Sequence, residues 1–265
     1  MSAELVIVGA GPAGVSTALW ARSFGIATQV LEAGSTAGGQ LHHIHHPLLN
    51  LAGAADGDAA TIARAFKDQL EASGAEVRYG AAATALDAAR PAVLDASGAW
   101  NAGQAVLIAT GVRRRRLEVP GERELEGRGV SWSATHDRAR FAGEEVVVAG
   151  GGDGAYENAL LLAEVGCPVT LVVRGAPRAR AEFRERVAAT LRIDVQEHTR
   201  VSAVLGEDRV SAVRLAGPRG EFEVPAAGLV VKAGVIPNTE WCASQVERDA
   251  EGYLPVDEQC GTSQP

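Results

Sequence analysis

The sequence contains few cysteines and no two of them at close spacing. Its 265 residues include three, Cys167, Cys242 and Cys260, and none forms a Cys-x-x-Cys motif. Thiols spaced this widely match no metal-ligand pattern and suit a reducing compartment. The sequence therefore predicts no metal site and a protein of the cytoplasm.

An excess of positive charge and a long apolar run are also absent. Lys and Arg number 25 against 33 Asp and Glu, a formal net charge of −8, which argues against nucleic-acid or anionic-membrane partners. No apolar stretch approaches the roughly 18–20 residues of a membrane span. Met1 leads directly into a strand-like stretch at residues 5–8 with no signal peptide between them. With 46% apolar residues, the chain has the balance of a globular protein with a buried core.

Two strand–turn–helix units are present, at residues 5–32 and 146–174. In each, a short apolar strand runs into a glycine-rich turn, a helix and a second apolar strand. Strands that alternate with helices in this way predict an α/β fold with parallel sheets covered by helices. Other expected elements are an amphipathic helix at 59–73, a strand at 105–108, a helix at 181–190 and a strand at 229–231.

The first turn, Gly9-Ala10-Gly11-Pro12-Ala13-Gly14, is a Gly-x-Gly-x-x-Gly motif between a strand and a helix. The first glycine permits a tight turn, the second admits a pyrophosphate, and the third lets the helix pack on the strand. Glu32 closes the second strand, where a carboxylate can accept hydrogen bonds from ribose hydroxyls. The alternative is a structural glycine turn beside an ordinary surface glutamate.

The second turn, Gly150-Gly151-Gly152-Asp153-Gly154-Ala155, repeats the pattern with alanine in the third position. Its second strand ends at Arg174, and Arg178 and Arg180 follow. A cation at this position can pair with a 2′-phosphate, which predicts NADP in preference to NAD. The alternative is that these arginines form a solvated helix start. Two such sites in one chain indicate a bound flavin that receives electrons from a diffusible nicotinamide.

The sequence resembles the low-molecular-weight thioredoxin-reductase-like flavoproteins over nearly its whole length. Each motif alone is weak evidence for this resemblance, but their common order and spacing are strong evidence. The motifs are Gly9 to Gly14; Gly38-Gly39-Gln40-Leu41; Asn50 with Gly53; Ala109-Thr110-Gly111; Val119-Pro120-Gly121-Glu122; Gly150 to Ala155; and Gly234 with Pro237-Asn238-Thr239. The resemblance implies two Rossmann-like domains, with the NADPH domain inserted into the FAD domain. We expect the FAD domain at 1–114 and 235–265 and the NADPH domain at 115–234.

The resemblance also implies the cofactors FAD and NADPH, and linkers that act as hinges between the two domains. The residues expected along FAD are Gly9, Gly11, Pro12, Ala13, Gly14, Glu32, Gly39, Gln40, Asn50, Thr110 and Gly111. Those expected along NADPH are Gly150, Gly152, Asp153, Ala155, Arg174 and Arg180. The family's His-Arg-Arg at the strand end is Val173-Arg174-Gly175 here, so one arginine of the set is retained.

One departure from the family concerns its Cys-x-x-Cys-Asp. The matching segment here is Ser133-Ala134-Thr135-His136-Asp137, and serine forms neither a thiolate nor a disulfide. The sequence therefore predicts that hydride passes from NADPH to FAD and then directly to an external acceptor, a small molecule or a small redox protein. His136 and Asp137 are the candidate catalytic residues, because a histidine near a flavin can transfer protons. The alternative is a surface histidine that fills a vacated position.

A second departure is the chain end. The sequence stops at residues 261–265, where relatives continue into a strand, a Gly-Asp pair and a last helix. We expect a truncated chain, and the resemblance implies a homodimer when that tail is intact.

Other functions and features remain open at this point. A ferredoxin or flavodoxin–NADP reductase of the same fold also lacks the cysteine pair, and a non-catalytic nucleotide-binding sensor or scaffold is a third hypothesis. The cluster His42, His43, His45 and His46 suits a metal, a polar substrate-facing loop or an ordinary solvated loop. The run Arg113–Arg116 suits an acidic protein partner such as ferredoxin or, as the simpler interpretation, a charged linker.

Overall fold

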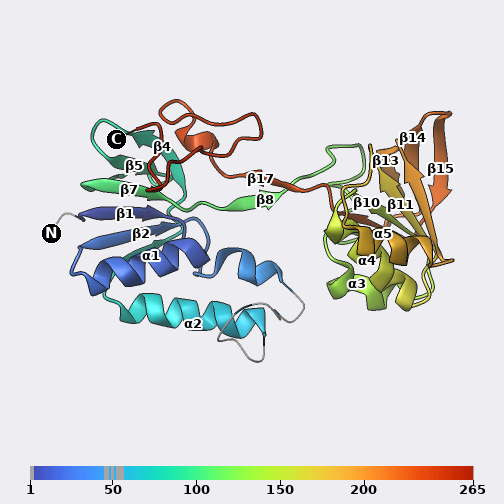
Figure 1. Cartoon of the computed structure of the whole chain (residues 1–265), viewed down its shortest axis with the longest axis horizontal. Helices are drawn as coiled ribbons and strands as arrows, with labels where there is room; N and C mark the ends of the chain where they lie inside the picture. Colours follow the sequence, from blue (N-terminus) through green and yellow to red (C-terminus); the bar gives the residue numbers. More distant parts are fainter. Residues whose placement is uncertain (1–2, 45–47, 49–50, 52–56, 265) are drawn as a thin grey trace. The chain divides into compact units, whose positions relative to one another are not determined.

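The computed structural model describes residues 3–44, 48, 51 and 57–264, and the chain divides into two compact units. Unit 1 comprises residues 1–113 and 236–265, and unit 2 comprises residues 114–235. The strands β8 (Val112–Arg114) and β17 (Val235–Pro237) pair as a two-stranded sheet (Figure 1). Each of these strands carries the chain from one unit to the other, so unit 2 is an insertion in unit 1.

Unit 1 is built on a four-stranded parallel sheet of order β3-β2-β1-β7. Its strands are β1 (Leu5–Val8), β2 (Thr28–Glu32), β3 (Glu76–Tyr79) and β7 (Ala105–Ile108). The central strand β1 is buried on both faces, which explains its unbroken apolar run, since a parallel strand between two layers has no solvent side.

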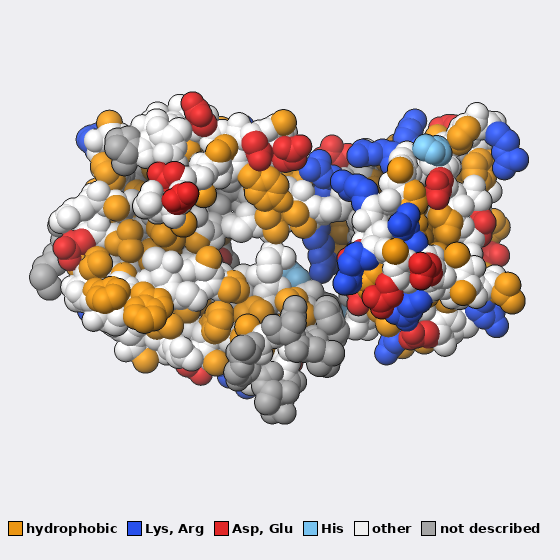
Figure 2. Space-filling model, viewed as in Figure 1, with side chains coloured by type: hydrophobic (Ala, Val, Ile, Leu, Met, Phe, Trp, Pro, Cys, Tyr) orange, Lys and Arg blue, Asp and Glu red, His pale blue; other side chains and the backbone are white. Residues whose placement is uncertain are grey.

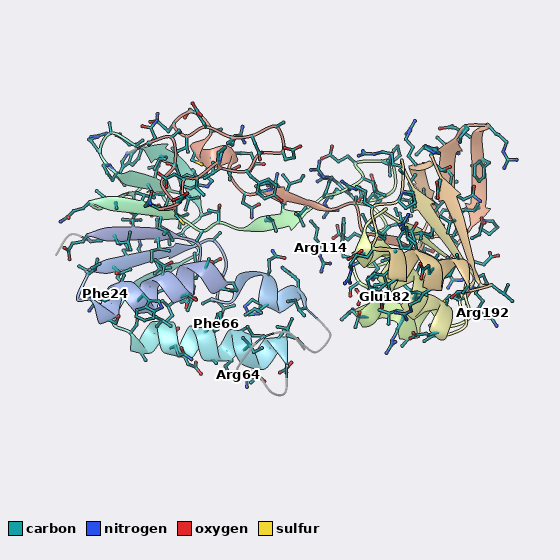
Figure 3. The ribbon with its side chains drawn as sticks, viewed as in Figure 1. Phe24, Arg64, Phe66, Arg114, Glu182 and Arg192 are labelled. Atoms are coloured by element: carbon teal, nitrogen blue, oxygen red, sulfur yellow. The ribbon has the colours of Figure 1, made fainter. Side chains whose placement is uncertain are left out.

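Different elements cover the two faces of this sheet. The helices α1 (Pro12–Ser23) and α2 (Ala59–Ala72) cover one face, where Ile7 and Val30 pack with Leu70 and the partly buried Phe66 (Figures 1 and 3). On the other face lies a three-stranded antiparallel sheet of β4 (Ala83–Asp87), β5 (Ala92–Asp95) and β6 (Trp100–Ala102). Cys242 and Val246 from the returning chain join the apolar cluster on that face.

Unit 2 repeats this plan on a five-stranded parallel sheet of order β12-β11-β10-β16-β9. Its strands are β9 (Val130–Ser131), β10 (Val146–Ala149), β11 (Val169–Val173), β12 (Ile193–Glu197) and β16 (Gly228–Val231). The helices on one face are α3 (Ala134–Phe141), α4 (Asp153–Glu164) and α5 (Ala181–Ala188). The antiparallel strands on the other face are β13 (Arg200–Leu205), β14 (Ala212–Gly217) and β15 (Gly220–Pro225) (Figure 1).

The side chains of β10 alternate between these two layers. Val146 and Val148 pack with the helices, whereas Val147 and Ala149 pack with β13–β15. Two short 3₁₀ helices, η1 (Gly39–His43) and η2 (Glu240–Cys242), complete the elements of the described residues.

The predicted fold class and elements agree with this architecture. The α/β prediction of two Rossmann-like domains is confirmed, as are the strands at 5–8, 105–108, 146–149 and 169–173. The helix expected at 59–73 ends at Ala72, and the one expected at 181–190 ends at Ala188. Within the described ranges, no helix has the length and apolar character needed to cross a bilayer.

The packing of Gly228 against Phe141 gives a test of the unit 2 core. A Cβ on Gly228 would lie 2.4 Å from Cε1 of the buried Phe141 ring. We expect Gly228→Ala to lower the free energy of unfolding by about 1–3 kcal/mol through overpacking. Phe141→Leu in the same chain should recover part of this loss, as measured by urea denaturation.

Gly154→Ala is the matched control for that experiment. A Cβ on Gly154 meets no atom within 4 Å, and the residue lies in α4 without a positive φ. Its substitution should therefore be neutral or slightly stabilising. Additive effects of Gly228→Ala and Phe141→Leu would contradict the proposed packing conflict.

Candidate functional site

The first glycine turn leaves no room for side chains at two of its positions, Gly9 and Gly14, and the same holds for Gly39 of η1, which faces the turn. A Cβ on Gly9, where φ is 106°, would lie 2.4 Å from the carbonyl oxygen of Ala109, which follows β7. A Cβ on Gly14 would lie 1.8 Å from the Gly9 oxygen, and one on Gly39 would lie 2.9 Å from the Gly11 Cα. The structure thus brings the predicted Gly9, Gly11, Gly14 and Gly39 together in one cradle of bare backbone.

The carboxylate of Glu32 lies against this turn. Its Oε2 accepts a hydrogen bond from the Ala10 amide at 2.7 Å, and its Oε1 accepts one from the Gly34 amide at 2.6 Å. The carboxylate thereby fixes the turn and places negative charge at the end of β2, where it can accept from ribose hydroxyls and repels a 2′-phosphate.

The helix that follows this turn is open at its amino end. Gly11 is the N-cap of α1, and Pro12 and Ala13 begin the helix with neither a side-chain cap nor an acidic residue in the first turn. The unpaired amides and the helix dipole at such an end favour an anion. Bare backbone, a carboxylate that can accept from a ribose and an open helix end together fit the diphosphate and ribose of FAD.

The remaining predicted FAD residues connect distant segments. The Thr110 hydroxyl donates to the Asn238 carbonyl at 2.7 Å, and the Asn238 side-chain amide donates back to the Thr110 carbonyl at 2.9 Å. The Gln40 amide donates to the Val112 carbonyl at 2.7 Å. The Gly111 carbonyl accepts from the Asn238 backbone amide at 3.0 Å. Thr110, Gly111 and Gln40 therefore hold η1 and the returning chain beside the end of β7. The predicted Asn50 lies outside the described residues.

The second glycine turn reproduces the close approach of the first. A Cβ on Gly150 would lie 2.3 Å from the carbonyl oxygen of Lys232, which follows β16. Ala155, in the third motif position, is buried and would lie 3.0 Å from that Cβ. Gly152 is the N-cap of α4, without a side-chain cap. The predicted Gly150, Gly152 and Ala155 therefore share one site.

Asp153 and Arg180 are brought together, and they bind each other. Asp153 Oδ1 accepts from the Arg180 amide at 2.8 Å and Oδ2 from its Nε at 2.7 Å, and these bonds lower the pKa of Asp153 below its usual range. The Arg180 guanidinium also lies 4.9 Å from the Phe183 ring centroid. The Arg178 amide donates to the Gly151 carbonyl at 2.7 Å. Arg180 thus holds the loop that follows β11 against the glycine turn.

A cavity of about 460 Å³ opens beside this turn in unit 2. Its basic lining residues are Arg115, Arg116, Arg174, Arg178, Arg200 and Lys232. No acidic side chain lines it within the described part of the chain. Basic side chains are also numerous on the face of unit 2 drawn in Figure 2. Cations around a glycine turn fit a phosphorylated nucleotide.

Sequence reasoning selected Arg174 in this cavity and missed most of its other basic residues. Arg115, Arg116, Arg200 and Lys232 come from three separate segments of unit 2 that the fold brings to one cavity. Arg115 and Arg116 belong to the arginine run, which was interpreted as a partner surface or a linker and not as part of a nucleotide site. No local motif marks Arg200, and the only signal for Lys232 was its position directly after an apolar strand.

Ser133, which matches the first family cysteine, caps a helix. The His136 amide donates to the Ser133 hydroxyl at 3.4 Å at the start of α3. His136 Nδ1 lies 2.9 Å from Asp137 Oδ1, and the Ser131 hydroxyl donates to Asp137 Oδ2 at 2.6 Å. Burial alone would raise the pKa of Asp137, but these hydrogen bonds outweigh it and hold that pKa below its usual value. The two candidate catalytic residues are therefore in contact.

The cysteines offer no substitute for the missing pair. All three are free; Cys260 is exposed, and Cys167 and Cys242 are buried. Burial raises the pKa of both buried thiols, which disfavours their thiolates.

The histidine cluster is described only in part. His42 Nε2 lies 2.8 Å from the Ala37 carbonyl oxygen, and His45 and His46 lie outside the described residues. Among the residues that are described, no group of three or more His, Cys, Asp or Glu side chains is arranged to hold a metal.

The arginine run makes ion pairs with neighbouring acids. Arg113 pairs with Glu240 at 2.6 Å, and Arg116 pairs with Glu126 at 2.7 Å. The Arg115 guanidinium also donates to the Val235 carbonyl at 3.3 Å. These contacts within the chain agree with the interpretation of the run as a charged linker.

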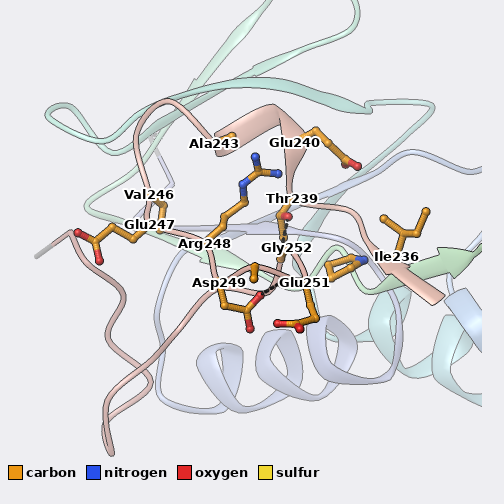
Figure 4. A pocket seen from close by; sticks show the side chains of 12 residues that line it. Ile236, Thr239, Glu240, Ala243, Val246, Glu247, Arg248, Asp249, Glu251 and Gly252 are labelled. Carbon is orange, nitrogen blue, oxygen red and sulfur yellow. Dashed lines mark hydrogen bonds between the residues drawn. The ribbon is translucent and has the colours of Figure 1, made fainter. Parts of the chain in front are cut away.

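A second pocket, of about 470 Å³, lies in the returning chain of unit 1 (Figure 4). Its charged lining residues are Glu240, Glu247, Arg248, Asp249 and Glu251. Carboxylates outnumber the single arginine, so this pocket repels phosphate. None of the described residues predicted to bind a cofactor lines it.

The comparisons with known proteins decide the family. The model of the pyridine nucleotide-disulphide oxidoreductases matches residues 3–265. The chain belongs to this family. It is 34% identical to thioredoxin reductase of Streptomyces coelicolor over 259 residues, 96% of this chain and 80% of that protein. It is 31% identical to the Listeria innocua thioredoxin reductase over 266 residues, 99% of this chain and 83% of that protein.

A solved structure agrees with these relatives. The crystal structure of Lactococcus lactis thioredoxin reductase matches with a TM-score of 0.84 and 27% identity, over 99% of this chain and 87% of that one. The resemblance inferred from the motifs is therefore confirmed. The chain is a flavin-dependent NAD(P)H oxidoreductase of the thioredoxin-reductase type, a type that uses FAD and NADPH.

The Glu32 carboxylate gives a test of the unit 1 site. We expect Glu32→Ala to weaken FAD binding by roughly 10- to 100-fold, because charged hydrogen bonds to two amides and a ribose partner are lost. Titration of the flavin-depleted protein with FAD measures this. Glu76→Ala is the matched control: it removes an exposed carboxylate from β3 that bonds only to Gln29 within the described residues. Equal weakening by both variants would contradict a specific role for Glu32.

Proposed function

We propose that this chain is an NADPH-dependent flavoenzyme that reduces an external acceptor directly, without a thiol relay. The observation that carries the proposal is the segment Ser133–Asp137, in which a helix-capping serine and a carboxylate-bound histidine stand where relatives carry two cysteines. The two buried thiols, Cys167 and Cys242, have raised pKa values, which disfavours their use in exchange reactions.

Unit 1 supplies the proposed FAD site. The backbone cradle around Gly9 and Gly39 and the open amino end of α1 would hold the pyrophosphate, and Glu32 would accept from the adenosine ribose. Gln40, Thr110 and Gly111 would border the remainder of the cofactor. When bound, FAD and NADPH supply the redox chemistry, a hydride donated by the nicotinamide and passed on through the flavin.

Unit 2 supplies the proposed NADPH site. Arg174 follows β11, where a dinucleotide places its 2′-substituent, and Arg178 lies in the same loop and lines the same cavity. The charges at the two turns are opposite, a carboxylate at the end of β2 and arginines after β11. This difference supports FAD at the first turn and a 2′-phosphorylated nucleotide at the second.

We assign the candidate proton transfer to His136. Asp137 lies against Nδ1, which favours the tautomer with the proton on Nδ1 and leaves Nε2 as the basic atom. Asp137 is in turn fixed by the Ser131 hydroxyl and by Arg140, whose Nη1 lies 3.4 Å from Asp137 Oδ1. In this role His136 would hold or release the proton that accompanies reduction of the acceptor.

The proposed acceptor is a small molecule or a small redox protein. The relatives are named thioredoxin reductases, so their names give thioredoxin as the substrate. This chain differs from the family at the residues that would act on a disulfide. We also propose a homodimer that works in the cytoplasm, by analogy with those relatives.

The first experiment follows the flavin band of the purified, FAD-loaded protein during anaerobic titration with NADPH and then NADH. We expect NADPH to bleach the flavin and to bind roughly 10- to 100-fold more tightly than NADH, because arginine–phosphate pairs are charge-assisted. Arg174→Gln should reduce this preference. A protein that binds NADPH but whose flavin stays oxidised would refute the proposal and favour a nucleotide-binding sensor.

A second experiment isolates the absent thiol relay. We expect the chain to reduce a quinone or a one-electron acceptor with NADPH, and to leave thioredoxin and an aromatic disulfide unchanged. The double variant Ser133→Cys/His136→Cys restores the family spacing and should gain disulfide reduction. Steady-state assays with each acceptor measure this, and thioredoxin reduction by the unaltered chain would contradict the direct mechanism.

A further inference from the structure

The unit 2 cavity has basic residues on both sides of its glycine turn. The sheet order places β10 between β11 and β16, so Arg174, which follows β11, and Lys232, which follows β16, flank the turn from opposite sides. The β11 side is where a dinucleotide places its adenosine ribose and 2′-phosphate. The cation on the β16 side has no part in that recognition.

The backbone of Lys232 lies directly against the first glycine of the turn. Its amide donates to the Ala149 carbonyl at 2.7 Å, and its carbonyl oxygen is the atom that a Cβ on Gly150 would meet at 2.3 Å. In a Rossmann unit the pyrophosphate crosses the sheet edge at this turn. The Lys232 side chain therefore begins beside the expected position of the two phosphates. It lies on the side of the turn away from β11, where the nicotinamide half of the dinucleotide is expected.

Lys232 is one of the residues that line the cavity. Its ammonium makes no hydrogen bond or ion pair with any residue that the structure describes. The charges that act on it most are Arg114, labelled in Figure 3, which opposes it, and Glu157 of α4, which favours it. The other charged groups around the cavity are Arg115, Arg116, Arg174, Arg178 and Arg200. A partly buried cation among like charges is costly unless an anion is bound.

We infer that Lys232 is a further nucleotide-binding residue, whose ammonium pairs with the pyrophosphate that NADPH and NADH share. Arg174 and Arg178 then bind the 2′-phosphate that only NADPH carries. Lys232 raises the affinity for NADPH and NADH alike and does not discriminate between them. This inference rests on the proposed NADPH site in unit 2. It agrees with the lowered pKa of Lys232, about 8, which burial and then the charge of Arg114 produce.

The test separates the two kinds of phosphate by using ligands that carry one, the other or both. Calorimetric titration of the FAD-loaded full chain uses NADP⁺, NAD⁺ and 2′-AMP, which has a 2′-phosphate and no pyrophosphate. We expect Lys232→Met to weaken the binding of NADP⁺ and of NAD⁺ by the same factor, roughly 10- to 100-fold, and to leave the affinity for 2′-AMP unchanged. Arg174→Met should give the complementary pattern, weakening NADP⁺ and 2′-AMP and sparing NAD⁺.

A control variant removes the effect of overall charge. Arg219→Met deletes an exposed cation in the β14–β15 turn of the same unit, outside the cavity, and should leave all three affinities unchanged. Unchanged NADP⁺ binding by Lys232→Met, or equal weakening of 2′-AMP, would overturn the inference. Failure of the unaltered chain to bind NADP⁺ or NAD⁺ would instead overturn the proposed function.

The pH dependence gives a second, independent readout. With a pKa of about 8, the free Lys232 ammonium loses its proton as the pH rises from 7 to 9. The dissociation constant of NADP⁺ should then rise about tenfold over this range, because only the protonated form pairs with phosphate. The 2′-phosphate, with a second pKa near 6, is already ionised throughout.

Lys232→Arg keeps its charge in this range, so its NADP⁺ affinity should stay constant from pH 7 to 9. This comparison also decides the question if Lys232→Met does not fold. Parallel pH profiles for the unaltered chain and Lys232→Arg would overturn the inference.

Discussion

Both proposed nucleotide sites depend on one steric constraint, the close approach of a glycine to the carbonyl that follows a neighbouring strand. Gly9 lies against Ala109 after β7, and Gly150 lies against Lys232 after β16. At these contacts a methyl group would fall within 2.4 Å of the oxygen in both units. Each turn can therefore connect a central strand of its sheet, β1 or β10, to the helix that follows, α1 or α4. The amino end of that helix faces the edge of the sheet, and the other residues of each site lie around it.

Charge distinguishes two turns that are otherwise alike. At the end of β2 a carboxylate closes the first turn by accepting from the Ala10 and Gly34 amides. After β11 the corresponding position is an arginine, and Asp153 is neutralised by Arg180 in the adjoining loop. In the proposed function, a single backbone design would thus serve a ribose with free hydroxyls in one unit and a phosphorylated ribose in the other, through side chains at the ends of two strands.

The local pattern of the sequence was enough to predict the strands, the glycine turns and the helices. Apolar strands, glycine turns and the helices between them repeat with the period of an α/β fold, and the structure has them at the expected residues. The pairing of Asp153 with Arg180 was not predictable, because it depends on how the loop after β11 folds back. The basic cavity lining was likewise hidden, since Arg116, Arg200 and Lys232 lie on separate segments that come together only in the folded unit. Side-chain partners across a sheet edge have no signature in local spacing.

The insertion of unit 2 also bears on how such proteins diversify. Its first and last segments are joined by a hydrogen bond from the Arg115 amide to the Gly234 carbonyl at 2.9 Å, and in unit 1 the Asn238 amide donates to the Gly111 carbonyl at 3.0 Å. The segment where the chain enters each unit and the segment where it leaves are therefore adjacent. One unit can for this reason be replaced by another without distorting the backbone of the unit that remains. Evolution can then graft a new nucleotide preference onto an old flavin domain, or alter the acceptor chemistry of one unit while the other stays intact.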